Sequence, residues 1–139
     1  MKYILTVLLL LTTTTLLSQE WITDKDFEEK VTGASAFDED GEDNVIVIEF
    51  WADFNKDNAF PDWEKLNNLE GVKYYRCDTA TSPKLKKELR IRMAPTLLLY
   101  LKGDAYIKFT ARAKLDLLCP VDYSKMVKAI EVVRREASY

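Results

Sequence analysis

The chain has 139 residues, of which 47% are hydrophobic and 31% are charged, a balance typical of one globular domain. Its formal charge of −3 offers no overall positive field for a phosphate backbone, so nucleic acid is not an expected partner. Histidine is absent, which removes Ser-His and Cys-His nucleophile pairs, histidine general bases and most zinc sites. We therefore expect neither a metal nor a cofactor.

The first 18 residues have the layout of a cleaved signal peptide. A single early lysine precedes the apolar run Tyr3 to Leu11, and the small residue Ser18 ends the segment. A membrane anchor is the competing interpretation, but Thr12 to Thr15 interrupt the apolar residues, which fall short of the roughly 20 that span a bilayer. We expect cleavage after Ser18, export to the periplasm or outside the cell, and a mature domain, residues 19–139, without a membrane span.

The mature chain begins with a helix signal followed by an acidic segment. Thr23 can cap a first helix, with Asp26 at the capping-box position, and the helix is expected to end near Thr32. Residues 33–44 contain five acids and two glycines, but they lack the alternating ligand order of an EF-hand calcium loop. This segment is predicted to be a solvated loop.

Residues 45–52 form a nearly unbroken run of β-branched and aromatic side chains, VIVIEFWA. Such a run predicts a central strand that is covered on both faces. Apolar residues then recur at every third position from Phe60 to Leu69, which indicates a helix. Because Pro61 is tolerated only in a first helical turn, this second helix is predicted to begin near Asn58.

The second half of the chain continues the alternation of strand and helix. Residues 72–77 predict a strand, and Ser82 followed by Pro83 supplies an N-cap and a proline at the first helical position of a short helix. The apolar run 97–101 and the alternating residues 106–109 flank a Lys-Gly-Asp turn and predict a hairpin.

A last helix is predicted after Asp122, whose side chain can cap it. The order of elements is then helix, strand, helix, strand, helix, strand, strand, helix. Strands that alternate with helices pair in parallel through crossover helices, and the hairpin adds an antiparallel edge. The predicted fold class is therefore α/β, with a mixed sheet flanked by helices.

At this level of detail the chain resembles the thioredoxin family over most of the mature domain, from about Trp21 to Arg135. Three segments carry the resemblance: Glu49-Phe50-Trp51-Ala52, Asp78, and Ile91-Arg92-Met93-Ala94-Pro95-Thr96-Leu97-Leu98-Leu99 before the Gly103 turn. The resemblance implies a three-layer sandwich around the mixed sheet. It also implies a cis peptide bond between Ala94 and Pro95.

The same resemblance exposes a departure from the family. Where thioredoxins have Trp-Cys-Gly-Pro-Cys after the central strand, this chain has the segment Phe54–Asn58, in which Asn55 and Asn58 replace both cysteines. Dithiol exchange needs one thiolate to attack a disulfide and a second thiol to release the mixed disulfide. Asparagine does neither, so we expect a redox-inactive domain rather than an enzyme.

By resemblance, a binding groove lies beside Pro95 and is flanked by Trp51. An extended peptide or protein segment in this groove could bond to the backbone next to Pro95 by strand addition. The competing interpretation is that the polar residues only cap a helix N-terminus. The expected binding residues are Trp51, Asn55, Lys56, Asp57, Asn58, Ala94, Pro95 and Thr96.

Glu49 falls where the family keeps a buried carboxylate beneath its dithiol. Burial disfavours the charged form, so the pKa of Glu49 should be raised if the side chain lacks a cationic partner. Lys56 or Lys73 could be that partner. Two interpretations stay open here: a repurposed proton acceptor, or a polar core residue paired with a lysine or a water molecule.

Cys77 and Cys119 are the only cysteines of the chain. In a thioredoxin-like fold both should point toward the end of the sheet that carries Pro95, and a loop that folds back, residues 112–120, would allow a disulfide. Cys77 is otherwise expected to be a small buried hydrophobe. The alternative function is a monothiol oxidoreductase or thiol sensor that uses Cys119, with Cys77 as its partner.

Overall fold

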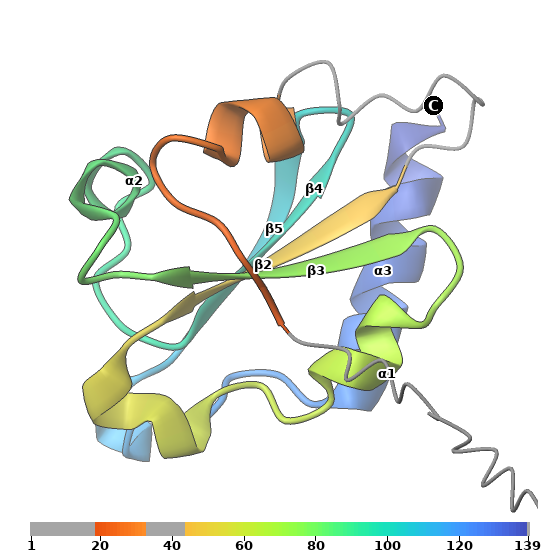
Figure 1. Ribbon diagram of the computed structural model, residues 1–139. Helices are drawn as coiled ribbons and strands as arrows, with labels where there is room; N and C mark the ends of the chain where they lie inside the picture. The colour runs from red at the N-terminus through yellow and green to blue at the C-terminus, as the bar shows by residue number, and fades with distance from the viewer. Residues whose placement is uncertain (1–18, 33–43, 139) are drawn as a thin grey trace, which may run out of the picture.

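The computed structural model describes residues 19–32 and 44–138 (Figure 1). The expected signal peptide and the predicted acidic loop, apart from Asn44, lie outside the described residues. Five strands form one sheet: β1 Glu20–Trp21, β2 Val45–Trp51, β3 Val72–Asp78, β4 Thr96–Leu101 and β5 Asp104–Thr110. The α-helices are α1 Trp63–Asn67, α2 Pro83–Glu88 and α3 Tyr123–Ala137, and the other helical segments are η1 Glu28–Thr32, η3 Asp53–Asn58 and η4 Ala113–Leu115.

The strands are arranged in the order β1-β3-β2-β4-β5. Strand β3 pairs in parallel with both β1 and β2, whereas β4 runs antiparallel to β2 and to β5. The parallel β2–β3 pair needs a crossover, which η3 and α1 supply, and the β4–β5 pair is a hairpin. The mixed sheet predicted from the sequence is therefore present.

Each face of the sheet has its own hydrophobic core. Side chains alternate along β2, so that Val45 and Val47 face the layer of α1 and α3, and Ile46 and Ile48 face the layer of η1 and α2. Figure 1 shows these two helical layers on opposite sides of the sheet. The architecture is the expected three-layer sandwich.

The second helix begins later than predicted. The chain forms the 3-10 segment η3 up to Asn58, and α1 starts only at Trp63. Pro61 disfavours helical backbone at the residue before it, Phe60, and the Phe60 amide instead donates to the buried carboxylate of Glu49 at 3.0 Å. The apolar spacing was a correct sign of a helix, but the prediction of a start near Asn58 is wrong.

The N-terminal part of the domain contains a strand that the sequence did not predict. Strand β1 has only two residues and pairs with Tyr75 and Arg76 of β3. Asp26 accepts a hydrogen bond from the Thr23 amide, as a capping box requires, but η1 is one turn of π-helix rather than a longer α-helix.

Helix α2 begins at Pro83 as predicted, but the Ser82 side chain makes no capping hydrogen bond. The carboxylate of Asp24 accepts instead from the amides of Lys84 and Leu85, at 3.1 and 2.8 Å. This tertiary cap ties the N-terminal segment to α2. In α3 the cap is local, as predicted, because Asp122 accepts from the Lys125 amide at 2.8 Å.

Candidate functional site

The two asparagines that stand at the cysteine positions of the family lie on η3 and hydrogen-bond to two other segments. The Asn55 Nδ2 atom donates to the carbonyl oxygen of Ala94 at 2.8 Å and to that of Leu117 at 3.0 Å. Asn58 Nδ2 donates to Asn55 Oδ1 at 2.8 Å and approaches the Asp116 carbonyl at 3.4 Å. We call this set of contacts the asparagine bridge.

The asparagine bridge meets an unusual backbone in the loop of residues 112–120. Asp116 and Leu117 both have positive φ angles, 54° and 53°. This left-handed conformation costs a residue other than glycine roughly 1–2 kcal/mol. It turns the carbonyls of both residues toward the asparagines, so the bridge stabilises a loop shape that is intrinsically unfavourable.

The bridge also hydrogen-bonds to the backbone carbonyl beside the cis Ala94–Pro95 bond. Ala94 and Pro95 are buried, and Thr96 is buried with its hydroxyl donating to the Met93 carbonyl at 2.6 Å. Because the Ala94 carbonyl already accepts from Asn55, an incoming peptide would have to displace Asn55 to pair with it. The Ala94 carbonyl of this groove is thus satisfied within the chain.

The remaining predicted groove residues have different roles. Lys56 and Asp57 are exposed on η3, and Trp51 is half-buried with its ring edge-on to Trp21 at 5.2 Å. The capping interpretation is wrong for Asn58, because α1 begins beyond it and its amide bonds across the asparagine bridge instead.

Glu49 lies beneath this end of the sheet and is completely buried. Its carboxylate accepts from the Phe60 amide, from the Tyr74 hydroxyl and, at 3.1 Å, from the Arg76 guanidinium. The expected lysine partner is therefore wrong, because Arg76 is the residue directly opposite Glu49 in the β2–β3 register. Burial raises the pKa of Glu49 above its ordinary value, although the positive charge of Arg76 opposes the rise.

Arg76 is itself buried and lies between two aromatic rings. Its guanidinium carbon is 5.9 Å from the centre of the Trp21 ring and 5.8 Å from that of the Tyr74 ring. Every donor and acceptor around Glu49 is thus part of one enclosed network. This arrangement favours a structural ion pair over a proton acceptor, since no thiol lies on η3 to give up a proton to Glu49.

The two cysteines are free thiols on opposite faces of the sheet. Cys77 packs in the core under η1 and α2, whereas Cys119 packs against the core under α1 and α3. The possible disulfide between them is therefore not formed. Burial raises the pKa of each thiol to about 11, which is the reverse of what a reactive cysteine needs.

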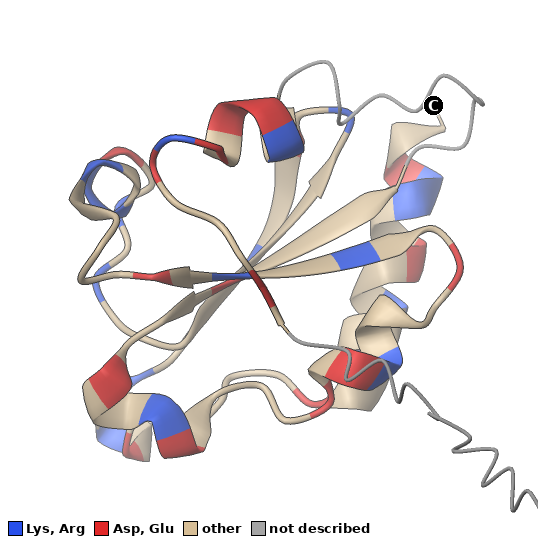
Figure 2. Ribbon diagram, viewed as in Figure 1, with Lys and Arg blue, Asp and Glu red and all other residues tan. Residues whose placement is uncertain are grey.

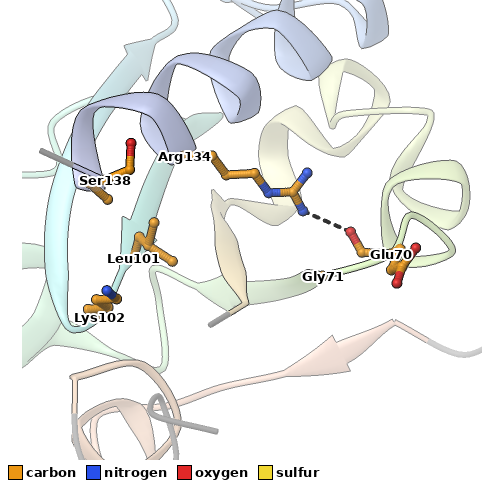
Figure 3. Close-up of a pocket in the computed structure, with 7 residues that line it drawn as sticks. Glu70, Gly71, Leu101, Lys102, Arg134 and Ser138 are labelled. Carbon is orange, nitrogen blue, oxygen red and sulfur yellow. Dashed lines mark hydrogen bonds between the residues drawn. The ribbon is translucent and has the colours of Figure 1, made fainter. Parts of the chain in front are cut away.

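A separate hollow lies at the other end of the sheet, where β4 ends at Leu101. It is lined by Glu70, Gly71, Lys102, Arg134 and Ser138 among others (Figure 3). The Arg134 guanidinium donates to the Glu70 carbonyl at 2.8 Å, which ties α3 to the start of β3. Within residues 19–32 and 44–138, no cluster of side chains could hold a metal ion and no helix is long and apolar enough to cross a membrane.

The fold and the cis-proline loop define a thioredoxin-like domain. The family model Thioredoxin matches residues 19–121, and the chain therefore belongs to the thioredoxin family. Among solved structures it is similar to the thioredoxin Mala s 13 of Malassezia sympodialis, described as a member of a pan-allergen family. The two share 25% sequence identity with a TM-score of 0.57, over 82% of this chain and 89% of that one. No curated protein matches the sequence.

The first prediction concerns the asparagine bridge. Asn55→Asp keeps the size of the side chain but replaces the donating Nδ2 with an oxygen that faces the Ala94 and Leu117 carbonyls. We expect the free energy of unfolding in urea to fall by about 2–3 kcal/mol, as for buried acceptors that lose their donor. Hydrogen exchange should also become faster in residues 112–120.

Asn67→Asp is a matched control for this substitution. The Asn67 side chain accepts from the Tyr74 amide through Oδ1, a role that a carboxylate retains. Its effect should be within about 0.5 kcal/mol. Equal losses in the two variants would show that the Asn55 contacts contribute nothing specific.

The second prediction concerns the buried pair of Glu49 and Arg76. Glu49→Leu leaves the Arg76 cation without a counter-ion and should lower the free energy of unfolding by about 3–5 kcal/mol. Adding Arg76→Met removes that cation and should recover roughly 1–3 kcal/mol. Urea unfolding followed by tryptophan fluorescence measures both changes. Strictly additive losses would contradict the pairing.

Proposed function

We propose that this protein is a redox-inactive member of its family that binds a protein partner at the end of the sheet carrying the asparagine bridge. The observation that carries the proposal is the replacement of both sulfur positions by amides that hydrogen-bond within the chain. An amide cannot accept or release electrons as a thiol pair does. Without a thiol pair, this end of the fold can still act through its surface, by binding another molecule.

That surface carries several exposed apolar side chains. Three exposed large hydrophobic side chains are next in sequence to residues that the bridge joins, namely Phe54, Met93 and Leu118, and a fourth, Leu115, lies in the same loop as Leu118. We call these four residues the apolar rim. Phe54 is 80% exposed, and exposed apolar patches of this kind mark interaction sites.

A hollow beside the apolar rim could receive a side chain of the partner. Its volume is about 410 Å³, and it has an apolar side, which includes Leu115, Leu118 and Phe109, and a polar side, which includes Lys108 and Arg112. The apolar side of this pocket suits an aliphatic or aromatic anchor, and such anchors are how protein interfaces concentrate their binding energy. The proposed partner is therefore a protein or extended peptide that carries an apolar anchor residue.

The proposal includes export of the mature domain, on the basis of the signal-like sequence of the first 18 residues. A partner would then lie in the periplasm or outside the cell. The alternative, a monothiol enzyme that uses Cys119, gains no support from a half-buried thiol with a pKa of about 11 that donates to the Val121 carbonyl.

The third prediction tests the loss of redox function. The mature protein should reduce insulin disulfides with dithiothreitol no faster than dithiothreitol alone. Asn55→Cys/Asn58→Cys restores two thiols at the family spacing on η3 and should accelerate the reaction. A reaction accelerated by the natural protein, and abolished when Cys77 and Cys119 are changed to alanine, would contradict the proposal.

The fourth prediction tests the apolar rim. A photo-reactive phenylalanine analogue at position 54 should give a discrete cross-linked protein adduct in cells that produce the full chain. The matched control is the same analogue at Val132, which is 37% exposed on α3. An adduct confined to position 54 supports the proposal. Absence of an adduct, or equal labelling at the two positions, would refute it.

A further inference from the structure

Positive charge is concentrated on α2 and the four residues that follow it. This stretch carries five cations and one acid, although the whole chain has a net charge of −3. Figure 2 shows the blue residues on α2 and the segment after it. Lys84 is paired with Glu88 at 4.0 Å, but four exposed cations have no side-chain partner within the described part of the chain: Lys86, Lys87, Arg90 and Arg92.

These four cations surround a shallow hollow of about 420 Å³. Pro83 and Ile91 complete its lining, and no acidic side chain takes part. Like charges held together without counter-ions repel one another, so a ligand of opposite charge would relieve the repulsion. The apolar surface between the charges adds a contact for something other than a bare ion.

The backbone of Arg90 is the second observation that points to a ligand. Arg90 has a φ of 54°, and it follows α2 at the position where helices usually place glycine. The Ile91 amide donates to the Lys86 carbonyl at 2.9 Å and the Arg90 amide to the Lys87 carbonyl at 3.2 Å, which completes the helix-ending motif. Glycine at this position would avoid roughly 1–2 kcal/mol of strain.

The Arg90 side chain is not needed to neutralise the end of α2. Lys108 already supplies a cation there, because its Nζ donates to the carbonyls of Leu89 and Arg90, at 3.3 Å each. The arginine is therefore kept at a strained position without an evident structural role. Residues held in this way cluster at functional sites.

We propose that the hollow lined by Lys86, Lys87, Arg90 and Arg92 binds an acidic segment of the partner protein. This inference rests on the proposed function, because Arg92 is followed directly by Met93 of the apolar rim. One extended partner chain can therefore place an apolar anchor at the rim and carboxylates over the hollow. The charges would guide the encounter and set the orientation of the partner.

The shape and composition of the hollow favour a polypeptide over other anions. Pro83 and Ile91 lie among the cations of this shallow hollow, so it offers apolar contact as well as positive charge, which suits a polypeptide with mixed side chains. Proteins that bind single-stranded nucleic acid stack the bases on aromatic rings, and the hollow contains none.

The fifth prediction is that the mature protein binds an acidic peptide. The probe is a fluorescent peptide that contains glutamate and leucine only, and its control is a second peptide in which glutamine replaces glutamate. Fluorescence anisotropy with the mature protein should show binding of the acidic peptide, weakened as salt rises from about 20 to about 200 mM. Lys86→Gln/Lys87→Gln should weaken the binding about tenfold. The matched control on α3, Lys125→Gln/Lys128→Gln, should change it less than about twofold.

Arg90→Gly separates a loss of binding from a loss of stability. This variant should be at least as stable in urea as the natural protein, yet bind the acidic peptide more weakly. The inference would be overturned if Arg90→Gly bound the acidic peptide as tightly as the natural protein, or if the glutamine peptide bound equally well. It would also be overturned if the two lysine pairs caused equal losses, or if the mature protein bound phosphatidylserine vesicles more tightly than the acidic peptide. An adduct at position 54 without binding of the acidic peptide would overturn this inference alone, and leave the proposed function intact.

Discussion

One side-chain amide determines the shape of the end of the molecule where thioredoxins carry their chemistry. Asn55 Nδ2 bonds to carbonyls that are 39 and 62 residues further along the chain, and it joins η3, the cis-proline loop and the loop of residues 112–120. A cysteine could not make these bonds, because a thiol is a weak donor with a single hydrogen. The asparagine that stands at a cysteine position of the family thus supplies a structural contact. The apolar rim is arranged around that contact.

The layer beneath the bridge is held together by a buried ion pair. Glu49 occupies the place of the family's buried acid, but its carboxylate is enclosed by Arg76, Tyr74 and the Phe60 amide. A buried charge is tolerated when it is paired and fully hydrogen-bonded. The pair also helps to shape the chain above it, since the Phe60 contact and Pro61 together delay the start of α1. The acid therefore serves the fold.

The errors of sequence-based reasoning share a physical cause. The two residues of β1 are too few to show a periodic pattern, and they form a strand only because β3 offers an edge. The cap of α2 comes from Asp24, although Ser82 has the right chemistry at the right place. The partner of Glu49 is decided by the register between two strands, in which Arg76 lies opposite. Local propensity contains no information about such contacts.

The sequence by itself determined the order of the main strands and helices, the covered central strand, the family and the missing dithiol. The order of the elements and the covered strand follow from periodicity and turn residues, which are properties of neighbouring residues, whereas the family and the missing dithiol follow from the resemblance of short motifs to those of thioredoxins. Only the tertiary structure decided that Asn55 and Asn58 bond to distant carbonyls and that Cys77 and Cys119 face opposite cores. Backbone carbonyls are the same in every residue. The sequence therefore does not predict which carbonyl accepts from a given side chain, because folding decides which carbonyl lies next to the donor.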